Sequence, residues 1–522
     1  MVTEVSLRVT PREAYTVELL RKAVARKLGL PPQEINDLRI THRSIDARQR
    51  KVMVNVTVKT ASGDDREVAP LVQPPAYQDV RHAAMTVVIV GAGPAGLFAA
   101  LRCLAKGIRP IVLERGDDVD TRRKKLADIS RKGHLDPESN YCFGEGGAGA
   151  YSDGKLYTRS KKRGSVTDVL TAFVAHGASE DILIDAHPHI GSNRLPDIIA
   201  SMRESIREKG GEVYFRSKVT ELLLDGDSAQ GVLLEDGRRI EGDAVILATG
   251  HGARDVYEML HRKGVDIEAK GLAIGVRLEH PQEVIDRIQY HDPKGRGEYL
   301  PAAEYQFVTQ VDGRGVYSFC MCPGGVIVPA ATERDGLVVN GMSAAGRSGR
   351  WANSGMVVEI HPEDFPEYSQ YGALCTMKLQ QDLERRFFAE AGNSFNAAAQ
   401  RMTDFVAGRP SKSLLPTSYA PGIHPARVDL LLPPFISDRL RRGFEDFGRK
   451  RKGFLTDRAQ VIGLESRTSS PLRVIRDSET LQHIRIRNLY PAGEGAGYAG
   501  GIVSAAIDGI RCIDSFIKTM SE

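Results

Sequence analysis

Residues 86–114 read TVVIVGAGPAGLFAALRCLAKGIRPIVLE, and this stretch decides the fold. Residues 86–90 form a short, wholly apolar run that is typical of a buried strand. A glycine-rich turn, GAGPAG at residues 91–96, leads from this run into a helical pattern at residues 95–106. A strand, a turn of this spacing and a helix together predict a βαβ unit that binds the pyrophosphate of a dinucleotide.

The glycines of this turn have separate tasks in such a unit. Gly91 permits the tight turn, Gly93 lets the backbone approach the pyrophosphate, and Gly96 lets the helix pack against the strand. The amides at the start of the helix face the anion. A second strand, IRPIVLE, ends at Glu114, 23 residues after Gly91, where a carboxylate can accept hydrogen bonds from a ribose diol. The predicted contacts from this unit are Gly91, Ala92, Gly93, Pro94, Ala95, Gly96, Glu114 and Arg115.

A second match to the same spacing, GEGGAG at residues 144–149, lacks the flanking elements. No apolar strand precedes it and no apolar helix follows it, so it is not another turn of the same kind. Two interpretations stay open: a flexible surface loop, or a backbone cradle against the cofactor. The cradle predicts contacts from Gly146, Gly147, Ala148 and Gly149.

Two later segments favour FAD as the dinucleotide. Residues 244–251, AVILATGH, form an apolar strand that ends in Ala-Thr-Gly, and residues 489–501, LYPAGEGAGYAGG, lead into a helix of small residues. Together with the GAGPAG turn, these segments resemble the FAD domain of the glutathione-reductase-like superfamily. The resemblance implies further FAD contacts at Thr249, Gly250, Gly493, Glu494, Gly501 and Ile502, with Glu494 on the ribityl chain. No further dinucleotide fingerprint occurs, so NAD(P)H is expected only as a transient electron donor.

Three long motifs carry a narrower resemblance. They are NYCFGEGGAGAYSDGKLYTR at residues 140–159, YSFCMCPGGVIVPA at residues 317–330 and ESRTSSPLR at residues 465–473. With RSIDAR at residues 43–48, they resemble the family of uncharacterised FAD-dependent dehydrogenases over nearly the whole chain. That family name implies a cofactor and a fold but no substrate.

The predicted fold is α/β, with a Rossmann-like FAD-binding domain, a mixed, β-rich inserted substrate domain and a small α+β N-terminal module. The module is expected at residues 1–80 and the first part of the FAD-binding domain at residues 81–265. The inserted domain is expected at residues 266–415. Residues 416–522 are expected to complete it and to return to the FAD-binding domain.

Catalytic candidates come from the polar motifs. Lys155 is a candidate proton donor or electrostatic anchor, although a lone lysine in a turn usually faces solvent. Arg467 and Arg473 either grip an anionic group or have a structural role, in which they bind loop carbonyls or contact the FAD phosphates. Cys320 and Cys322 fit a redox pair or a metal site, but buried structural thiols are the simpler interpretation, and no matching His/Cys pair lies at ligand spacing, so no metal site is predicted.

Composition limits the remaining function classes. The net charge is +4 over 522 residues, which indicates no general attraction to nucleic acid. The N-terminal sequence lacks the apolar region of a signal peptide, and no membrane span is expected, so the predicted location is cytoplasmic. The leading hypothesis is an FAD-dependent oxidoreductase that transfers hydride to or from an unidentified small molecule. The alternative is a flavoprotein that modifies or docks on RNA or a protein, through the N-terminal module and a basic helix at residues 439–452.

Overall fold

The computed structural model describes residues 2–158 and 163–521. Within them, a parallel sheet of five strands forms the centre, in the order β21-β10-β4-β5-β6. Its strands are β4 (Thr86–Val90), β5 (Arg109–Leu113), β6 (Glu212–Tyr214), β10 (Ala244–Leu247) and β21 (Leu489–Pro491). This is the βαβ arrangement that the GAGPAG turn predicts.

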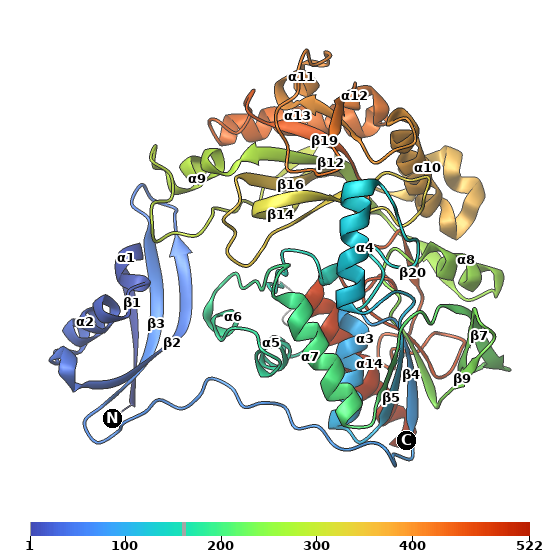
Figure 1. Cartoon of the computed structure of the whole chain (residues 1–522), viewed down its shortest axis with the longest axis horizontal. Helices are drawn as coiled ribbons and strands as arrows, with labels where there is room; N and C mark the ends of the chain where they lie inside the picture. The colour runs from blue at the N-terminus through green and yellow to red at the C-terminus, as the bar shows by residue number, and fades with distance from the viewer. Residues whose placement is uncertain (1, 159–162, 522) are drawn as a thin grey trace.

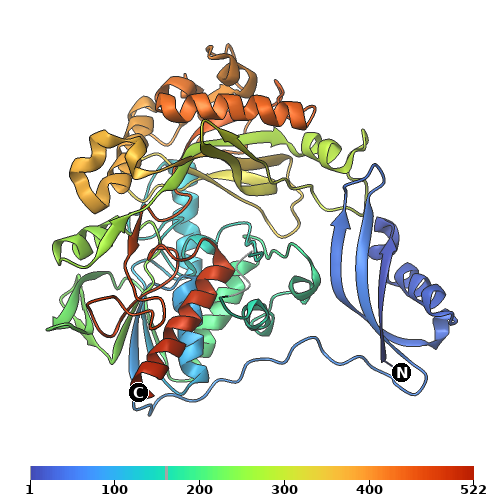
Figure 2. The same ribbon diagram turned by 180° about the vertical axis from the view of Figure 1, so that it is seen from behind.

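Alternate residues of β4 serve two different cores, which explains why the strand is apolar throughout. Val87 and Ile89 pack into the core on the helical face, and Val88 and Val90 pack into the core on the other face. Helices pack on the first face (Figures 1 and 2): α3 (Pro94–Ala105), α5 (Val166–Ala175), α7 (Leu195–Glu208) and α14 (Ile502–Ser521). The second face meets a small antiparallel sheet and one helix: β7 (Val219–Asp225), β8 (Ser228–Leu234), β9 (Arg239–Glu241) and α8 (Arg254–Arg262).

A second, larger sheet lies above this layer (Figure 1). Among the described strands its order is β13-β14-β16-β12-β19-β17-β18, and β15 pairs with β14. Its strands are β12 (Leu272–Pro281), β13 (Val308–Val311), β14 (Arg314–Pro329), β15 (Val339–Met342), β16 (Trp351–Ile360), β17 (Ala397–Arg401), β18 (Ile423–Pro425) and β19 (Gln460–Glu465). Because β19 lies in the middle of the sheet, the inserted domain runs to about residue 465 before the chain returns to the parallel sheet.

Helices cover the outer face of this sheet and complete its core. They are α9 (Gln282–Tyr290), α10 (Cys375–Glu390), α11 (Met402–Ala407), α12 (Val428–Leu431) and α13 (Pro434–Lys450). The basic helix of the sequence is α13. Its Phe444 and Phe447 are buried against the sheet, while Arg449 and Lys450 pair with Asp446 on the same helix. These contacts describe an amphipathic helix with a solvated basic face.

The N-terminal module is a three-stranded antiparallel sheet with a helical cover. It contains β1 (Val2–Val9), β2 (Ile35–Asp46), β3 (Met53–Ser62), α1 (Pro11–Ala14) and α2 (Val17–Leu28), with the strand order β1-β3-β2. An extended stretch leads from it to β4 along the edge of the molecule (Figures 1 and 2). Arg43 of the RSIDAR motif fastens the module to α6 (Asp181–Ile184) and the residue after it, since its guanidinium lies 2.7 Å from Asp185 and 3.2 Å from Asp181.

Candidate active site

The turn between β4 and α3 is built from glycines with two different tasks. A Cβ at Gly91 would lie 2.4 Å from the Ala248 carbonyl oxygen, and one at Gly96 would lie 1.9 Å from the Gly91 carbonyl oxygen. Glycine is required at both positions because the neighbouring backbone leaves no room for a side chain. Gly93 has an extended backbone (φ −79°, ψ −175°), and the nearest described atom to its Cβ position is Gly147 Cα at 3.8 Å. The described chain does not require glycine at position 93, whereas an anion lying against the backbone would.

Helix α3 begins at this turn with free backbone donors. Its N-cap is Gly93, Pro94 opens the helix, and no described side chain caps it. The first amides of a helix lack intrahelical partners, and the helix dipole places partial positive charge there. Helix α14 packs closely beside α3, because a Cβ at Gly509 would lie 2.0 Å from the Ala95 carbonyl oxygen. The unpaired amides and the helix dipole make the start of α3 a suitable anion-binding position.

Glu114, after β5, ties the two glycine-rich segments together. Its Oε2 accepts a hydrogen bond from the Ala92 amide at 2.9 Å. Its Oε1 accepts from the amides of Gly116 and Gly144, each at 2.9 Å. The side chain is buried yet lines the cavity described below. A carboxylate has about four acceptor sites, so Glu114 can hold this backbone and still accept a hydrogen bond from a ribose hydroxyl.

Arg122 holds the second glycine-rich segment, a role that the motifs of the sequence did not indicate. The fully buried guanidinium donates to the carbonyl oxygens of Asn140 (2.8 Å), Tyr141 (3.0 Å) and Glu145 (2.7 Å). The available signal was position on α4 (Val119–Lys132), where Arg122 shares the buried face with Val119, Leu126 and Ile129. A guanidinium on an apolar helix face indicates that backbone carbonyls or acids lie opposite it.

The glycine-rich segments surround a cavity of about 380 Å³, within the usual range for ligand sites. Strands β14 and β15 contribute its other wall through Phe319, Cys320, Val328 and Asn340. The predicted residues that line it are Gly91, Gly93, Pro94, Ala95, Glu114, Arg115, Gly147, Ala148, Gly149, Lys155, Thr249, Gly250, Arg467, Glu494, Gly501 and Ile502. Ala92, Gly96, Gly146, Gly493 and Arg473 are outside the lining of this cavity among the described residues.

The late acidic segment enters the cavity from the end of β21. The carboxylate of Glu494 lies 3.5 Å from Nδ1 of His251, the residue after the Ala-Thr-Gly strand end. The Gly493 amide donates to Asp508 at 2.8 Å, and Asp508 forms a buried ion pair with Arg476 at 2.7 Å. Gly493 therefore supports the loop that presents Glu494.

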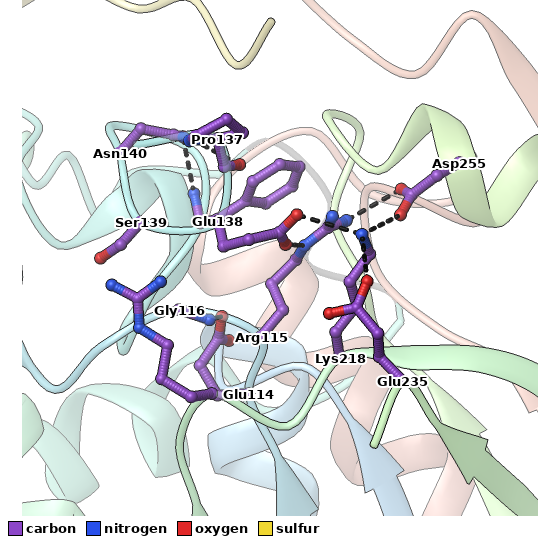
Figure 3. Close-up of polar contacts among 12 residues, drawn as sticks. Glu114, Arg115, Gly116, Pro137, Glu138, Ser139, Asn140, Lys218, Glu235 and Asp255 are labelled. Atoms are coloured by element: carbon purple, nitrogen blue, oxygen red, sulfur yellow. Dashed lines mark hydrogen bonds and ion pairs between the residues drawn. The ribbon is translucent and has the colours of Figure 1, made fainter. Parts of the chain in front are cut away.

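A charged network closes the cavity beside Glu114 (Figure 3). Arg115 donates to Glu138 at 2.7 Å and to Asp255 at 2.8 Å. Lys218 pairs with Glu138 at 3.1 Å. Arg115 and Lys218 both line the cavity. Their charges are balanced by these acids, so this end of the cavity is a fixed polar wall.

Lys155 reaches the cavity from the loop after the second glycine-rich segment. Its Nζ donates to the Met321 carbonyl oxygen and lies 3.1 Å from the Asp153 carboxylate. Burial would raise the pKa of Asp153, but Lys155 and Arg347 outweigh burial and lower that pKa to about 2. Burial would lower the pKa of Lys155, but Asp153 and the thiols of Cys322 and Cys320 outweigh it and raise that pKa. These contacts favour the protonated, positively charged form of Lys155.

Arg467 is held in the cavity wall by other protein groups. Its guanidinium lies 2.9 Å from the buried Glu384 carboxylate and donates to Thr332 Oγ1 at 2.7 Å. Arg254 shares the same carboxylate at 2.8 Å. Burial would raise the pKa of Glu384, but the two arginines outweigh burial and lower it to about 2. These contacts favour the structural interpretation of Arg467.

Arg473 lies apart from Arg467. It belongs to β20 (Leu472–Val474), which pairs with β11 (Ile267–Ala269), and its side chain is 40% exposed. It pairs with Glu268 at 2.9 Å and lies over the Tyr498 ring at 5.5 Å from the ring centre. The structure does not bring the two arginines together around one anion.

Within residues 2–158 and 163–521, no group of three or more His, Cys, Asp and Glu side chains is arranged to hold a metal ion. No helix in this part of the chain has the length and apolar character needed to cross a membrane. The basic run at residues 159–163 falls outside the described residues, except for residue 163.

Three family descriptions match parts of the chain. Residues 271–468 match the FAD-dependent protein, C-terminal domain-like family. Residues 123–263 match the flavin containing amine oxidoreductases, and residues 1–61 match a domain of unknown function.

Similar proteins are known over most of the chain. An uncharacterized protein of Clostridium beijerinckii is 38% identical over 519 residues, which cover 96% of each chain. The L-aspartate oxidase of Streptomyces coelicolor is 27% identical over 237 residues, 40% of each chain. The crystal structure of CtdE in complex with FAD and substrate 4 is 13% identical, covers 84% of this chain and 81% of that chain, and has a TM-score of 0.31.

Proposed function

The chain belongs to the family of the Clostridium beijerinckii protein, an FAD-dependent oxidoreductase family, and on this premise we propose that it transfers hydride between bound FAD and a small organic substrate. The main support for this proposal is the conformation of Gly93. Its extended backbone and open Cβ position are explained by a diphosphate that lies against the amides at the start of α3.

The proposed FAD contacts follow the cavity from one end to the other. Gly91, Gly93 and the first amides of α3 would hold the diphosphate, with Gly147, Ala148 and Gly149 on the opposite side. Glu114 would accept a hydrogen bond from the adenosine ribose, beside the wall formed by Arg115. Thr249, Gly250, Glu494, Gly501 and Ile502 would line the ribityl and flavin end. Bound FAD supplies the two-electron hydride chemistry.

The chain's own groups would orient the substrate and exclude water. Lys155 keeps its proton because of Asp153, so we assign it an anchoring task and not proton donation. Arg467 would keep its cavity wall in place through Glu384. A nicotinamide nucleotide is the proposed external electron donor, visiting the same cavity transiently.

The first test is the colour and redox behaviour of the purified protein. It is expected to carry FAD, with the visible absorbance of an oxidised flavin. Anaerobic addition of NADPH or NADH should remove that absorbance. A folded protein that shows no flavin absorbance and takes up no added FAD would contradict the proposal.

Gly93→Val directly tests whether a diphosphate lies against the open Cβ position of Gly93. The variant should fold with a thermal midpoint close to that of the wild-type apoprotein, because the Cβ position is free of close described contacts. It should lose FAD, with a dissociation constant at least ~100-fold higher, because the side chain would occupy diphosphate space. Gly346→Val is the matched control: Gly346 is exposed, its Cβ position has Ser348 Oγ at 3.9 Å as the nearest described atom, and it lies outside the cavity lining.

A further inference from the structure

Cys320 and Cys322 occupy an irregular part of β14 that faces the cavity. Cys320 has a left-handed backbone (φ 43°), which is unusual for a residue with a side chain. The pairing of β14 with β16 shifts register between Phe319 and Cys322. Cys320 is partly exposed and lines the cavity, whereas Cys322 is fully buried behind it. The irregularity therefore brings one thiol to the cavity and leaves the other covered.

The two cysteines contact each other and share cationic neighbours. The Cys322 thiol donates a hydrogen bond to the Cys320 carbonyl oxygen at 3.4 Å. Arg277 donates to the Cys320 carbonyl oxygen at 2.6 Å, and the same nitrogen lies 3.3 Å from Cys322 Sγ. Lys155 holds the carbonyl oxygen of Met321, the residue between the two cysteines. Two cations are thus fixed beside the pair.

The charges around the pair favour a thiolate at Cys320. The neighbouring Cys322 side chain lowers the pKa of the Cys320 thiol, burial opposes this, and Lys155 and Arg277 add to the lowering. Cys320 and burial raise the pKa of Cys322. Burial raises the pKa of Glu465, the acid paired with Arg277, to about 7, which weakens the nearby negative charge. The remaining charged or titratable neighbours are Asp153, Arg347 and Tyr305.

We propose that Cys320 and Cys322 form a redox-active dithiol whose substrate is a low-molecular-weight disulfide. A cavity-facing thiol with a buried thiol two residues further along the strand is the arrangement of an attacking and a resolving cysteine. Purely structural thiols are found in apolar surroundings, and these lie beside Lys155 and Arg277. The inference rests on the proposed flavoenzyme function, because the reduced flavin is the two-electron donor that resets the pair.

The proposed exchange balances in two steps. The Cys320 thiolate attacks one sulfur of a disulfide R–S–S–R, which forms a Cys320–S–S–R bond and releases one R–S⁻. Cys322 then loses its proton, which passes to a released thiolate, and its sulfur attacks Cys320 Sγ. A Cys320–Cys322 disulfide forms and the second R–S⁻ leaves. The substrate gains two electrons and the cysteines lose two. The reduced flavin would return two electrons to the cysteine disulfide, and one proton would restore the Cys322 thiol while Cys320 returns as a thiolate.

Thiol release separates the roles of the two cysteines. Holoprotein with reduced cysteines and oxidised flavin, mixed with 2-hydroxyethyl disulfide without an electron donor, should release about two thiols per chain. Cys322→Ser should release about one and keep a mixed disulfide at Cys320, visible by mass spectrometry. Cys320→Ser should release almost none, while Cys375→Ser, which changes a buried cysteine outside the cavity lining, should match the wild type. Equal release from the wild type and Cys320→Ser would overturn the proposal.

An anaerobic dithionite titration of diamide-oxidised protein distinguishes this inference from the flavin function. The wild type should accept about four electrons per flavin, and both serine variants about two. A yellow wild-type protein that accepts only about two would overturn the dithiol and leave the flavin function standing. A colourless protein that binds no FAD would overturn both, since the pair would lack its electron donor.

Discussion

Two segments of this chain share the glycine spacing GxGxxG and have different architectures. Residues 91–96 join a buried strand to a helix, and the flanking chain sets their conformation. Residues 144–149 form a loop that ends in a short 3-10 helix at Gly147–Gly149, with left-handed glycines at Gly144, Gly146 and Gly147. Arg122 and Glu114 hold that loop through backbone hydrogen bonds. Glycine spacing therefore indicates a close backbone approach, and the apolar flanks decide whether a Rossmann turn results.

The largest effect is expected from Gly96→Val in the first segment. The added side chain would overlap the Gly91 carbonyl oxygen, 1.9 Å from its Cβ, and neither backbone can move without separating α3 from β4. We expect a loss of more than ~3 kcal/mol in the free energy of unfolding, measured by urea denaturation, or no soluble protein. Gly93→Val in the same turn should fold. If Gly96→Val keeps wild-type stability, the packing explanation of that glycine is wrong.

Arg122→Met should produce the next largest effect, in the second segment. The variant leaves the buried carbonyl oxygens of Asn140, Tyr141 and Glu145 without their charged donor. Each buried polar group without a partner costs roughly 1–3 kcal/mol, so the three carbonyl groups predict a loss of at least about 3 kcal/mol in urea denaturation. Arg123→Met is the control. That side chain is 56% exposed, and its removal should change stability by less than about 0.5 kcal/mol. Similar losses in both variants would contradict the role of Arg122.

The difference between the segments also explains what the sequence could predict. The first segment follows from local chemistry, since apolar flanks, glycine spacing and the position of Glu114 lie within 29 residues. The cradle interpretation of the second segment agrees with its place in the cavity wall, but its support from Arg122 could not be read from spacing. The sequence also could not predict the ion pair between Glu384 and Arg467, which joins distant segments. Nor could it predict that Arg473 pairs with Glu268, apart from Arg467. The placement of Cys320 depends on a shift in strand register, which periodicity alone does not reveal.

Glu145 distinguishes the two segments by its response to pH. It occupies the position in the second segment that Ala92 occupies in the first. Its side chain is fully buried, pairs with Arg203 at 2.7 Å and leaves Oε1 without a described partner. Burial raises the pKa of Glu145 to about 7. Because the folded state then favours the protonated acid, Glu145 should lower stability as the pH rises from about 4.5 to about 7.

Glu145→Gln should remove this pH dependence while keeping the hydrogen bond that the side chain accepts from the Val119 amide. Between pH 5 and pH 8, wild-type stability should fall relative to the variant by on the order of 2 kcal/mol, measured by urea denaturation at each pH. Parallel stability curves for the two proteins would show that the carboxyl group titrates alike in both the folded and unfolded states.

The smallest effect is expected from Gly147→Ala, at the point where the two segments meet. A Cβ there would lie 3.1 Å from Gly93 Cα, and the left-handed backbone (φ 60°) adds strain of about 1 kcal/mol. Gly133→Ala is the matched control, because Gly133 has φ 65° at the end of α4 and lies outside the cavity lining. Both variants should lose stability, with a greater loss for Gly147→Ala because of the Gly93 contact, but only Gly147→Ala should weaken FAD binding, by roughly three- to tenfold in fluorescence titration. Equal FAD affinity in the two variants would mean that the second segment does not hold the diphosphate against the first.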